Sequence, residues 1–253
     1  MKVAVCIPAR YDSTRFPAKV LAKETGKYLI QHTYEQARKS RLASEILIAA
    51  DDERIITAAR SFGARCALTS KDHASGTDRV AEVAFNLKVD IVVNLQADEP
   101  EIDPAHIDRV AELLIESGDG DMATLGTEFQ SPEQVADPNV VKVVTDCFGR
   151  AIYFSRSVIP YEREAGGVGP LEYYMRHIGI YAYRREFLLE LTTLPQTPLE
   201  RLEKLEQLRA IENGHTILVG QVEHTCDGID TPQQYAEFVK RYARNAGPNQ
   251  TVA

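Results

Sequence analysis

The sequence has 253 residues, of which 44% are hydrophobic and 26% are charged, and its formal net charge is -8. This composition is ordinary for a globular protein and is sufficient for a sizeable core. An acidic chain argues against charge-driven binding to nucleic acid, so an anionic ligand must meet a local cluster of cations.

Several other classes of protein also lack support in the sequence. The four cysteines, Cys6, Cys66, Cys147 and Cys226, form no CxxC pair, so neither a zinc site nor a redox dithiol is indicated. The chain shows no signal-peptide pattern and no apolar run long enough to span a membrane, and we expect a cytoplasmic protein that binds no membrane. There is no repeat and no GxxxxGK[ST], HExxH or GxSxG motif, so a P-loop kinase, a zinc hydrolase and a serine hydrolase are unsupported.

The first predicted element is a buried strand that delivers cations to its carboxyl end. Residues 3–7 (VAVCI) form an apolar run that stops at Pro8. The polar loop that follows carries Arg10, Ser13, Thr14, Arg15 and Lys19. Ligands of open α/β sheets bind at the carboxyl ends of strands, and Arg and Lys hold phosphate oxygens well. The loop is therefore interpreted as a polyphosphate cradle, the alternative being a solvated surface loop.

The next segments alternate between helical and strand patterns. A helix is predicted over residues 28–40, a strand over 45–49, a helix over 53–62 behind the N-cap candidates Asp51 and Asp52, and a strand over 65–68. This alternation predicts a parallel sheet with helices on both faces, joined by right-handed crossovers.

Residues 69–79 (TSKDHASGTDR) form a loop that ends where Thr77 or Asp78 can cap a helix reaching about residue 87. The small residues 74–76 (ASG) allow the backbone to approach a flat ligand such as a base. Arg79 falls in the first helical turn, where the helix dipole disfavours a cation. Arg79 is thus either a functional residue that faces the cleft or a simple surface residue.

The most apolar strand is predicted over residues 91–95 (IVVNL), and we expect it to be central. It leads directly into Gln96, Ala97, Asp98 and Glu99. A carboxylate at the end of a central strand, opposite a loop of Arg and Lys, suits a Mg²⁺ ligand that bridges the protein to phosphate oxygens. In the alternative interpretation, the two acidic residues cap the helix that begins near Pro104.

The alternation ends after the helix over residues 107–115. Strands over 122–127, 140–145 and 151–155 predict an antiparallel region for a second substrate, and residues 161–170 a mobile loop that acts as a lid. The strand over 177–183 places His177, Tyr181 and Tyr183 on one face. That face is interpreted as a polar pocket or, alternatively, as a structural cluster.

The C-terminal part is predicted to contain two helices and one strand. A helix over residues 198–213 is predicted, with a buried stripe made of Leu202, Leu205, Leu208 and Ile211. Glu206 and Gln207 lie off the stripe, either solvated or bound to sugar hydroxyls. A strand over 216–222 precedes Asp230, a candidate second metal ligand, which is followed by Thr231 and Pro232 as a helix start. We expect a single domain over residues 1–245 and a disordered tail over 246–253.

Seven motifs in register resemble those of the 3-deoxy-manno-octulosonate cytidylyltransferases, or CMP-Kdo synthetases. They are 7–19 (IPARYDSTRFPAK), 69–79 (TSKDHASGTDR), 95–100 (LQADEP), 153–161 (YFSRSVIPY), 176–184 (RHIGIYAYR), 202–209 (LEKLEQLR) and 228–232 (GIDTP). The resemblance implies a Rossmann-like nucleotidyltransferase fold, a homodimer with contacts from residues 122–170, and Mg²⁺. It also implies the reaction of CTP with Kdo to give CMP-Kdo and pyrophosphate, which activates Kdo for lipopolysaccharide assembly.

The resemblance further implies a role for individual residues. The catalytic residues would be Lys19, Arg10, Asp98 and Asp230, of which Asp98 and Asp230 hold the metal. The nucleotide would contact Ala9, Arg10, Arg15, Lys19, Ala74, Ser75, Gly76 and Arg79. The sugar acid would contact Gln96, His177, Tyr181, Glu206 and Gln207. No side chain stands out as a general base.

Two positions depart from the family pattern, since Ala18 and Ala97 stand where the family usually has glycine. An alanine costs stability if the backbone there needs a positive φ. Two other functions fit the same motifs: a cytidylyltransferase for another sugar acid, such as 8-amino-Kdo or a sialic-acid-like substrate, and a CTP-binding homologue without turnover.

Overall fold

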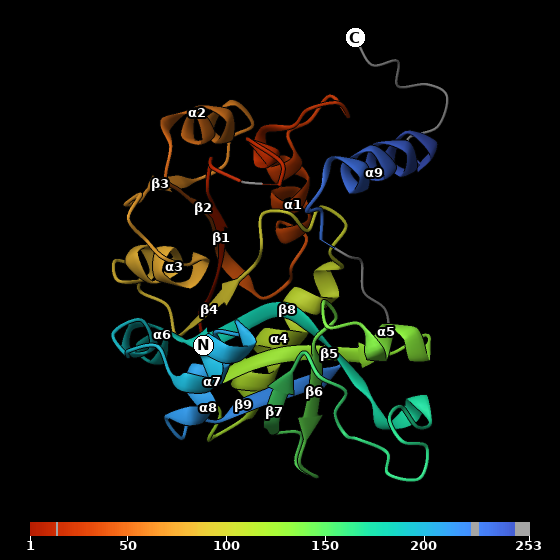
Figure 1. Ribbon diagram of the computed structural model, residues 1–253. Coiled ribbons are helices and arrows are strands. Elements are labelled where there is room, and N and C mark those ends of the chain that lie inside the picture. Colours follow the sequence, from red (N-terminus) through yellow and green to blue (C-terminus); the bar gives the residue numbers. More distant parts are fainter. Residues whose placement is uncertain (14, 224–227, 246–253) are drawn as a thin grey trace. The chain divides into compact units, whose positions relative to one another are not determined.

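The computed structural model describes residues 1–13, 15–223 and 228–245, and the chain divides into two compact units (Figure 1). The first unit contains residues 2–88, 94–104 and 228–245 of the described chain, and the second contains residue 1, 89–93 and 105–223. The fold is α/β with a mostly parallel central sheet, as predicted. A single domain stays a prediction, while Thr14, Cys226 and the predicted tail lie outside the described residues.

The first unit is built on three parallel strands in the order β3-β2-β1. They are β1 (Val3–Ala9), β2 (Ala43–Ala50) and β3 (Cys66–Leu68). All residues of β1 are buried, so both faces of this strand are covered. In α/β folds, helices provide this cover. The strand does not stop at Pro8, because Ala9 still accepts a hydrogen bond from the backbone N–H of Asp51 at 3.3 Å.

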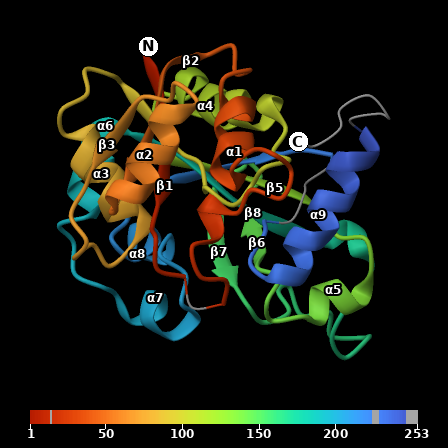
Figure 2. The ribbon, with the colours of Figure 1, turned by 90° about the horizontal axis from the view of Figure 1, so that it is seen from above.

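In the first unit, helices from the N-terminal and C-terminal segments of the chain pack against each other. They are α1 (Leu29–Ala37), α2 (Glu53–Ser61), α3 (Gly76–Ala84), α9 (Pro232–Asn245) and the 3₁₀ helix η1 (Lys19–Leu21). Helices α1 and α9 lie side by side (Figures 1 and 2), with the His32 ring 5.1 Å from Phe238 and 4.8 Å from Tyr242. Ile229 is packed in the same core as Leu29, so this contact also fixes the segment that carries Asp230.

The second unit contains both parallel and antiparallel strands. They are β5 (Met122–Glu128), β6 (Lys142–Thr145), β7 (Ala151–Ser155), β8 (Met175–Arg184) and β9 (Ile217–Gln221). Strand β5 pairs with β8 in the antiparallel sense and with β9 in the parallel sense. The predicted antiparallel insertion over 122–170 is therefore smaller than expected, because β5 belongs to the main pairing and only β6 and β7 form a hairpin. Strand β4 (Ile91–Asn94) is buried throughout.

The helices of the second unit differ from the prediction near residue 204. The unit contains α4 (Pro104–Glu116), α5 (Pro132–Ala136), α6 (Arg185–Leu191), α7 (Pro198–Glu203), α8 (Leu208–Glu212) and η2 (Leu171–Tyr173). The single helix predicted over 198–213 is broken at Lys204, which has a φ of 56°. Leu202 is consequently 80% exposed, whereas Leu205 and Leu208 are buried as predicted.

Residues 161–170 form a loop with one isolated bridge between Glu162 and Gly167, and their function as a lid stays a prediction. In the part of the chain that the structure describes, no helix has both the length and the apolar character needed to cross a membrane.

Candidate active site

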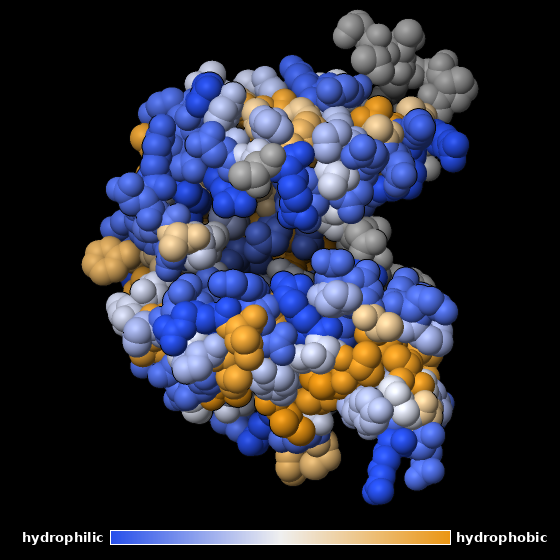
Figure 3. All heavy atoms as spheres, in the orientation of Figure 1, coloured by the Kyte–Doolittle hydropathy of each residue, from blue (hydrophilic) through white to orange (hydrophobic). Residues whose placement is uncertain are grey.

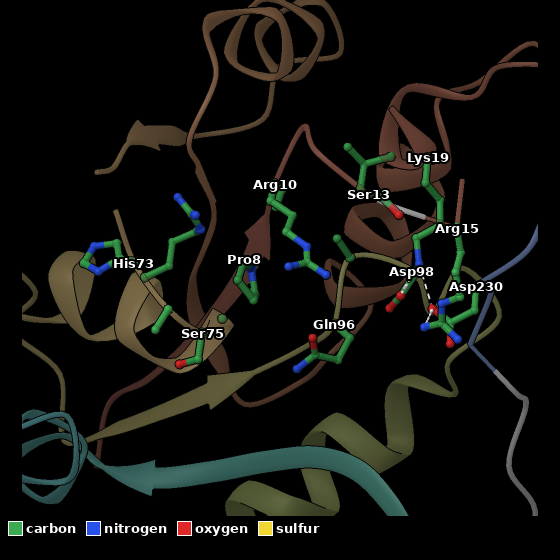
Figure 4. A pocket seen from close by; sticks show the side chains of 16 residues that line it. Pro8, Arg10, Ser13, Arg15, Lys19, His73, Ser75, Gln96, Asp98 and Asp230 are labelled. Atoms are coloured by element: carbon green, nitrogen blue, oxygen red, sulfur yellow. Dashed lines mark hydrogen bonds and ion pairs between the residues drawn. The ribbon is translucent and has the colours of Figure 1, made fainter. Parts of the chain in front are cut away.

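A cleft in the first unit contains all the residues predicted to contact the nucleotide. Its cavity volume is about 300 Å³. It is lined by Pro8, Ala9, Arg10, Ser13, Arg15, Lys19, Val20, His73, Ala74, Ser75, Gly76, Arg79, Gln96, Ala97, Asp98 and Asp230. Figure 4 shows Lys19, Asp98 and Asp230 gathered at one end, His73 and Ser75 at the other, and Arg10 between them. Four of the seven sequence motifs, 7–19, 69–79, 95–100 and 228–232, thus converge on one cavity.

Lys19 lies between the two predicted metal ligands. Its ammonium group is 2.6 Å from Asp98 Oδ2 and 3.2 Å from Asp230 Oδ1. The Lys19 side chain is only 10% exposed, whereas those of Asp98 and Asp230 are 27% and 43% exposed, so water screens the contact to Asp230 more than the contact to Asp98. The arrangement shows that a cation fits between the two carboxylates.

The backbone around the two carboxylates is fixed from several sides. The N–H of Ile229 donates to the carbonyl of Asp98 at 2.8 Å, which ties the two acidic segments together. The Gln234 side chain accepts hydrogen bonds from the backbone N–H groups of Asp230 and Thr231, and Thr231 accepts from the N–H of Gln234 as the predicted N-cap of α9. The position of Asp230 therefore follows from the start of this helix.

The metal assignment favours Asp98 over its neighbour Glu99. Burial, followed by repulsion from the Asp98 carboxylate, raises the pKa of Glu99 to about 8, so Glu99 is mostly protonated near neutral pH. No group of three or more His, Cys, Asp or Glu side chains able to hold a metal occurs among the described residues. Two carboxylates suit Mg²⁺, which usually takes one or two carboxylates and completes its shell with water and substrate phosphates. The donor set fits that ion.

The cations of the phosphate loop are available to a ligand to different degrees. Arg10 is exposed and makes no hydrogen bond or ion pair within the described chain. Arg15 donates to Asp230 Oδ1 at 2.9 Å, and the two side chains are 66% and 43% exposed. Four cationic side chains line the cleft against two carboxylates, which gives the local positive charge that an acidic chain needs for a polyphosphate ligand.

The two alanines that replace family glycines differ in backbone conformation. Ala18, directly before Lys19, adopts the left-handed region with φ 53° and ψ 26°. Ala97 has no positive φ and is buried, its carbonyl accepting a hydrogen bond from Thr33 at 3.0 Å. The predicted cost of alanine therefore applies at Ala18 and not at Ala97.

The loop at the other end of the cleft is held by helix α3. Ser75, not Thr77 or Asp78, is the N-cap: its hydroxyl accepts from the N–H of Asp78, whose carboxylate accepts from the N–H of Ser75. A Cβ at Gly76 would lie 3.4 Å from the Pro8 ring, at the limit of an ordinary van der Waals contact, so the start of α3 lies close to β1. The Ser75 hydroxyl is thus committed to the helix start.

Arg79 is both a lining residue and a buried structural contact. Its Nη1 donates to Thr69 Oγ1 and to the Ser70 carbonyl, and its Nη2 donates to Asp51 at 3.2 Å. A guanidinium has five N–H donors, so some of them remain for a ligand in the cleft. The interpretation of Arg79 as a plain surface residue is wrong, because it is 4% exposed.

The residues predicted for the sugar acid are distributed over both units. Gln96 lines the cleft of the first unit. In the second unit, His177 lies 5.5 Å from the Tyr181 ring and accepts from or donates to Thr124 at 3.0 Å. Burial lowers the pKa of His177 to about 3, so its imidazole is neutral.

The two polar residues next to α8 also lie in the second unit. Gln207 is 4% exposed, and its Nε2 has no hydrogen-bond partner among the described residues. Glu206 is half-buried. The assignment of these side chains to the sugar acid stays a prediction.

The sequence analysis missed the contribution of Asp51, which it treated only as a possible helix cap. Asp52 is the N-cap of α2, whereas Asp51 accepts a hydrogen bond from the Tyr11 N–H and pairs with Arg79. A signal was present, because Asp51 directly follows a strand adjacent to β1 and so lies at the same edge of the parallel sheet.

Two relatives of high sequence identity carry the name of one activity. A sequence model of the cytidylyltransferase family matches residues 4–217. The 3-deoxy-manno-octulosonate cytidylyltransferase of Solibacter usitatus (strain Ellin6076) is 52% identical to this chain, and the match covers 92% of this chain and 91% of the relative. The enzyme of the same name from Geobacter sulfurreducens is 46% identical, and the match covers 95% of this chain and 99% of the relative.

A solved structure gives the same result. The CMP:2-keto-3-deoxy-manno-octonic acid synthetase complexed with CTP superposes with a TM-score of 0.91 at 39% identity, covering 97% of this chain and 100% of its own. The motifs, the fold and these matches agree, and the chain belongs to the 3-deoxy-manno-octulosonate cytidylyltransferases of the cytidylyltransferase family.

Proposed function

We propose that this protein transfers the cytidylyl group of CTP to 3-deoxy-D-manno-octulosonate, giving CMP-Kdo and pyrophosphate. The observation that carries the proposal is the Lys19 ammonium group held between Asp98 and Asp230 in a cleft that Arg10 and Arg15 also line. Relatives of high identity bear the name of this activity. The product would activate the sugar for lipopolysaccharide biosynthesis in the cytoplasm, where CTP is made.

In this proposal the triphosphate lies at the end of the cleft that holds Lys19, and the base lies towards Ala74 and Ser75. Arg10 binds phosphate oxygens through its guanidinium fork, and Lys19 leaves the carboxylates to neutralise charge that develops on the leaving pyrophosphate. Asp98 and Asp230 would hold Mg²⁺, which when bound draws electron density from the α-phosphate and lowers the pKa of the attacking hydroxyl.

The chemistry requires one bond to form and one to break. The anomeric hydroxyl oxygen of the sugar acid bonds to the α-phosphorus, the bond from that phosphorus to the bridging oxygen breaks, and pyrophosphate leaves in line. Because no side chain of the cleft is an evident general base, the chain contributes mainly by orientation and by preorganised charge.

The sugar acid would contact Gln96 in the first unit and His177, Tyr181, Glu206 and Gln207 in the second. A neutral His177 offers a hydrogen bond rather than a charge, and the unpartnered Nε2 of the buried Gln207 is a donor suited to a sugar hydroxyl or carboxylate. Binding of the substrate would satisfy that donor.

The proposal includes a homodimer formed through the region of residues 122–170. Figure 3 shows apolar side chains gathered over the region of β6 and β7 in the second unit. Two large apolar side chains of this segment, Phe148 and Ile152, are 75% and 57% exposed. Burial of such residues between two copies would remove them from water.

Pyrophosphate release from CTP and Mg²⁺ with a panel of sugar acids tests the proposed reaction. Kdo should give the highest kcat/KM. A higher value with 8-amino-Kdo or a sialic acid would replace Kdo by that substrate, and CTP binding without turnover on any member would show a non-catalytic homologue.

A further inference from the structure

Asp51 connects two segments that line the cleft without lining it itself. It follows β2, and its Oδ1 accepts a hydrogen bond from the Tyr11 N–H at 2.9 Å. Its Oδ2 lies 3.2 Å from Arg79 Nη2, and the Asp51 and Arg79 side chains are only 14% and 5% exposed. One buried carboxylate therefore contacts the loop after β1 and the first turns of α3.

Arg79 extends this connection to the loop after β3. Its Nη1 donates to the hydroxyl of Thr69 and, at 3.1 Å, to the carbonyl of Ser70. The loop after β1 supplies Arg10 and Ser13 to the cleft, and the loop after β3 supplies residues 73–75. Asp51 and Arg79 thus join the phosphate side of the cleft to its base side.

Tyr11 is also held through its ring. The Arg54 guanidinium lies 3.3 Å from the centre of the Tyr11 ring and makes two hydrogen bonds of 2.7 Å to Asp52. Within the described chain, no hydrogen bond or ion pair holds the side chain of Arg10, the preceding residue. The position of the Arg10 guanidinium therefore depends on how Tyr11 is anchored.

We propose that Asp51 is a positioning residue that fixes the spacing between the phosphate-binding loop and the base-binding loop. A nucleoside triphosphate that spans both loops needs this spacing before it binds, and preorganisation of this kind lowers the cost of binding. The inference rests on the proposed function in one respect, which is that CTP occupies this cleft.

The variants Asp51→Asn and Asp51→Ala separate the two contacts of the carboxylate. The amide oxygen of asparagine can still accept from the Tyr11 N–H, whereas the charge opposite Arg79 is lost; alanine removes both contacts. Asp121→Asn is the matched control, because Asp121 also joins a backbone N–H, that of Thr216, to a basic side chain, that of His215, and does not line the cleft.

Steady-state kinetics and calorimetric titration of CTP without sugar acid provide the measurements. We expect Asp51→Asn to raise the KM and Kd for CTP about tenfold, and Asp51→Ala to raise them further, with kcat within about twofold of the parent value. Asp121→Asn should leave the KM for CTP unchanged. An unchanged KM in both Asp51 variants would overturn the inference.

A purely structural role is separated from positioning by combining Asp51→Ala with Arg10→Ala. When Arg10 is absent, the position of its loop matters less, so Asp51→Ala should then raise the Kd for CTP by at most about threefold. If Asp51→Ala raises the Kd for CTP by the same factor in the parent and in Arg10→Ala, the positioning role is refuted. Since CTP binding is measured without the sugar acid, failure of turnover with Kdo would concern the proposed function alone.

Discussion

Ala18 is held in the left-handed backbone region immediately before the lysine that joins the two acidic residues of the cleft. For a residue with a Cβ atom this conformation costs about 1–2 kcal/mol, whereas glycine adopts it readily. The strain lies at the position where the family usually has glycine, and it is adjacent to the predicted catalytic Lys19.

Ala18→Gly should therefore stabilise the first unit. Glycine has more conformational freedom than alanine in the unfolded chain, which lowers the free energy of unfolding by about 0.5 to 1 kcal/mol. Relief of the strain outweighs this term, and we expect a net increase in the free energy of unfolding of about 0.5 kcal/mol. Ala97→Gly is the matched control, because Ala97 has no positive φ, and it should destabilise by about 0.5 to 1 kcal/mol. Urea unfolding should show a higher free energy of unfolding than the parent for Ala18→Gly and a lower one for Ala97→Gly. A change in the same direction in both variants would argue against strain at Ala18.

In the proposed mechanism, Lys19 and Mg²⁺ compete for the same two carboxylates, those of Asp98 and Asp230. Lys19→Met removes the cation that Asp98 and Asp230 share and leaves only Arg15 paired with Asp230, which favours a divalent ion between the two carboxylates. Without nucleotide, millimolar Mg²⁺ should raise the melting temperature of Lys19→Met by about 2 to 4 °C more than that of the parent.

The double variant Lys19→Met with Asp98→Asn is the control for this effect. It should lose most of the additional stabilisation by Mg²⁺, because one of the two carboxylates is neutral. An equal Mg²⁺ response in all three proteins would show that the metal does not bind between these side chains.

At the scale of secondary-structure elements, the packing of α1 against α9 contains a buried histidine. His32 hydrogen-bonds to Thr25 Oγ1 at 2.7 Å and packs against Phe238 and Tyr242. Burial lowers the pKa of His32 to about 4, below its ordinary value of 6.5. Between about pH 6.5 and pH 4, His32 is therefore mostly protonated in the unfolded chain and mostly neutral in the folded protein.

The sign of the resulting pH dependence follows directly. Above about pH 6.5, His32 is neutral in both states and the free energy of unfolding does not depend on its protonation. As the pH falls from 6.5 towards 4, the free energy of unfolding decreases by about 1.4 kcal/mol per pH unit. In His32→Gln, the loss between pH 7 and pH 5 should be about 2 kcal/mol smaller than in the parent. Urea unfolding at the two pH values measures this difference, and parallel losses in the two proteins would exclude His32 as the cause.

The elements also show which sequence signals are reliable. Strands β1 and β2 and helices α1 and α2 were predicted because hydrophobic periodicity and N-caps are local. The break at Lys204 was missed, because an i, i+3 leucine pattern does not reveal a left-handed residue, and Leu202 is exposed as a result. The role of Asp51 was missed for a different reason: its partners, Tyr11 and Arg79, are far from it in sequence.

At the scale of the molecule, the sequence motifs predicted the composition of the cleft better than its internal contacts. The charged residues that were assigned to the nucleotide and the metal all line one cavity: Arg10, Arg15, Lys19, Arg79, Asp98 and Asp230. The sequence could not reveal that Arg79 is buried in an ion pair, because its partner Asp51 is far from it in sequence. The Ser75 cap is a local signal, a capping box with Asp78, and the prediction of Thr77 or Asp78 as the cap was wrong. For the sugar residues, the sequence pattern alone left the alternatives open, and only the resemblance to the family assigned them to the sugar acid.

The homodimer gives a prediction for the whole molecule. Ile152→Asp would place a charge within the proposed interface while altering a side chain that is exposed in the single chain. We expect the parent to sediment as a dimer and Ile152→Asp to shift towards the monomer with an unchanged melting curve at low concentration. A parent that sediments as a monomer at all concentrations would exclude this interface.

The central claim is that Asp98 and Asp230 form the catalytic centre of a cytidylyltransferase. The most direct measurement is pyrophosphate release from CTP and Kdo with Mg²⁺ by Asp98→Asn and Asp230→Asn, with the Kd for CTP measured in parallel. Asp12→Asn serves as the control, since Asp12 is an exposed acid of the same loop as Arg10 that does not line the cleft. We predict a loss of turnover of about 100-fold or more in both cleft variants while CTP still binds, and none in the control; near-normal turnover in both cleft variants would contradict the account.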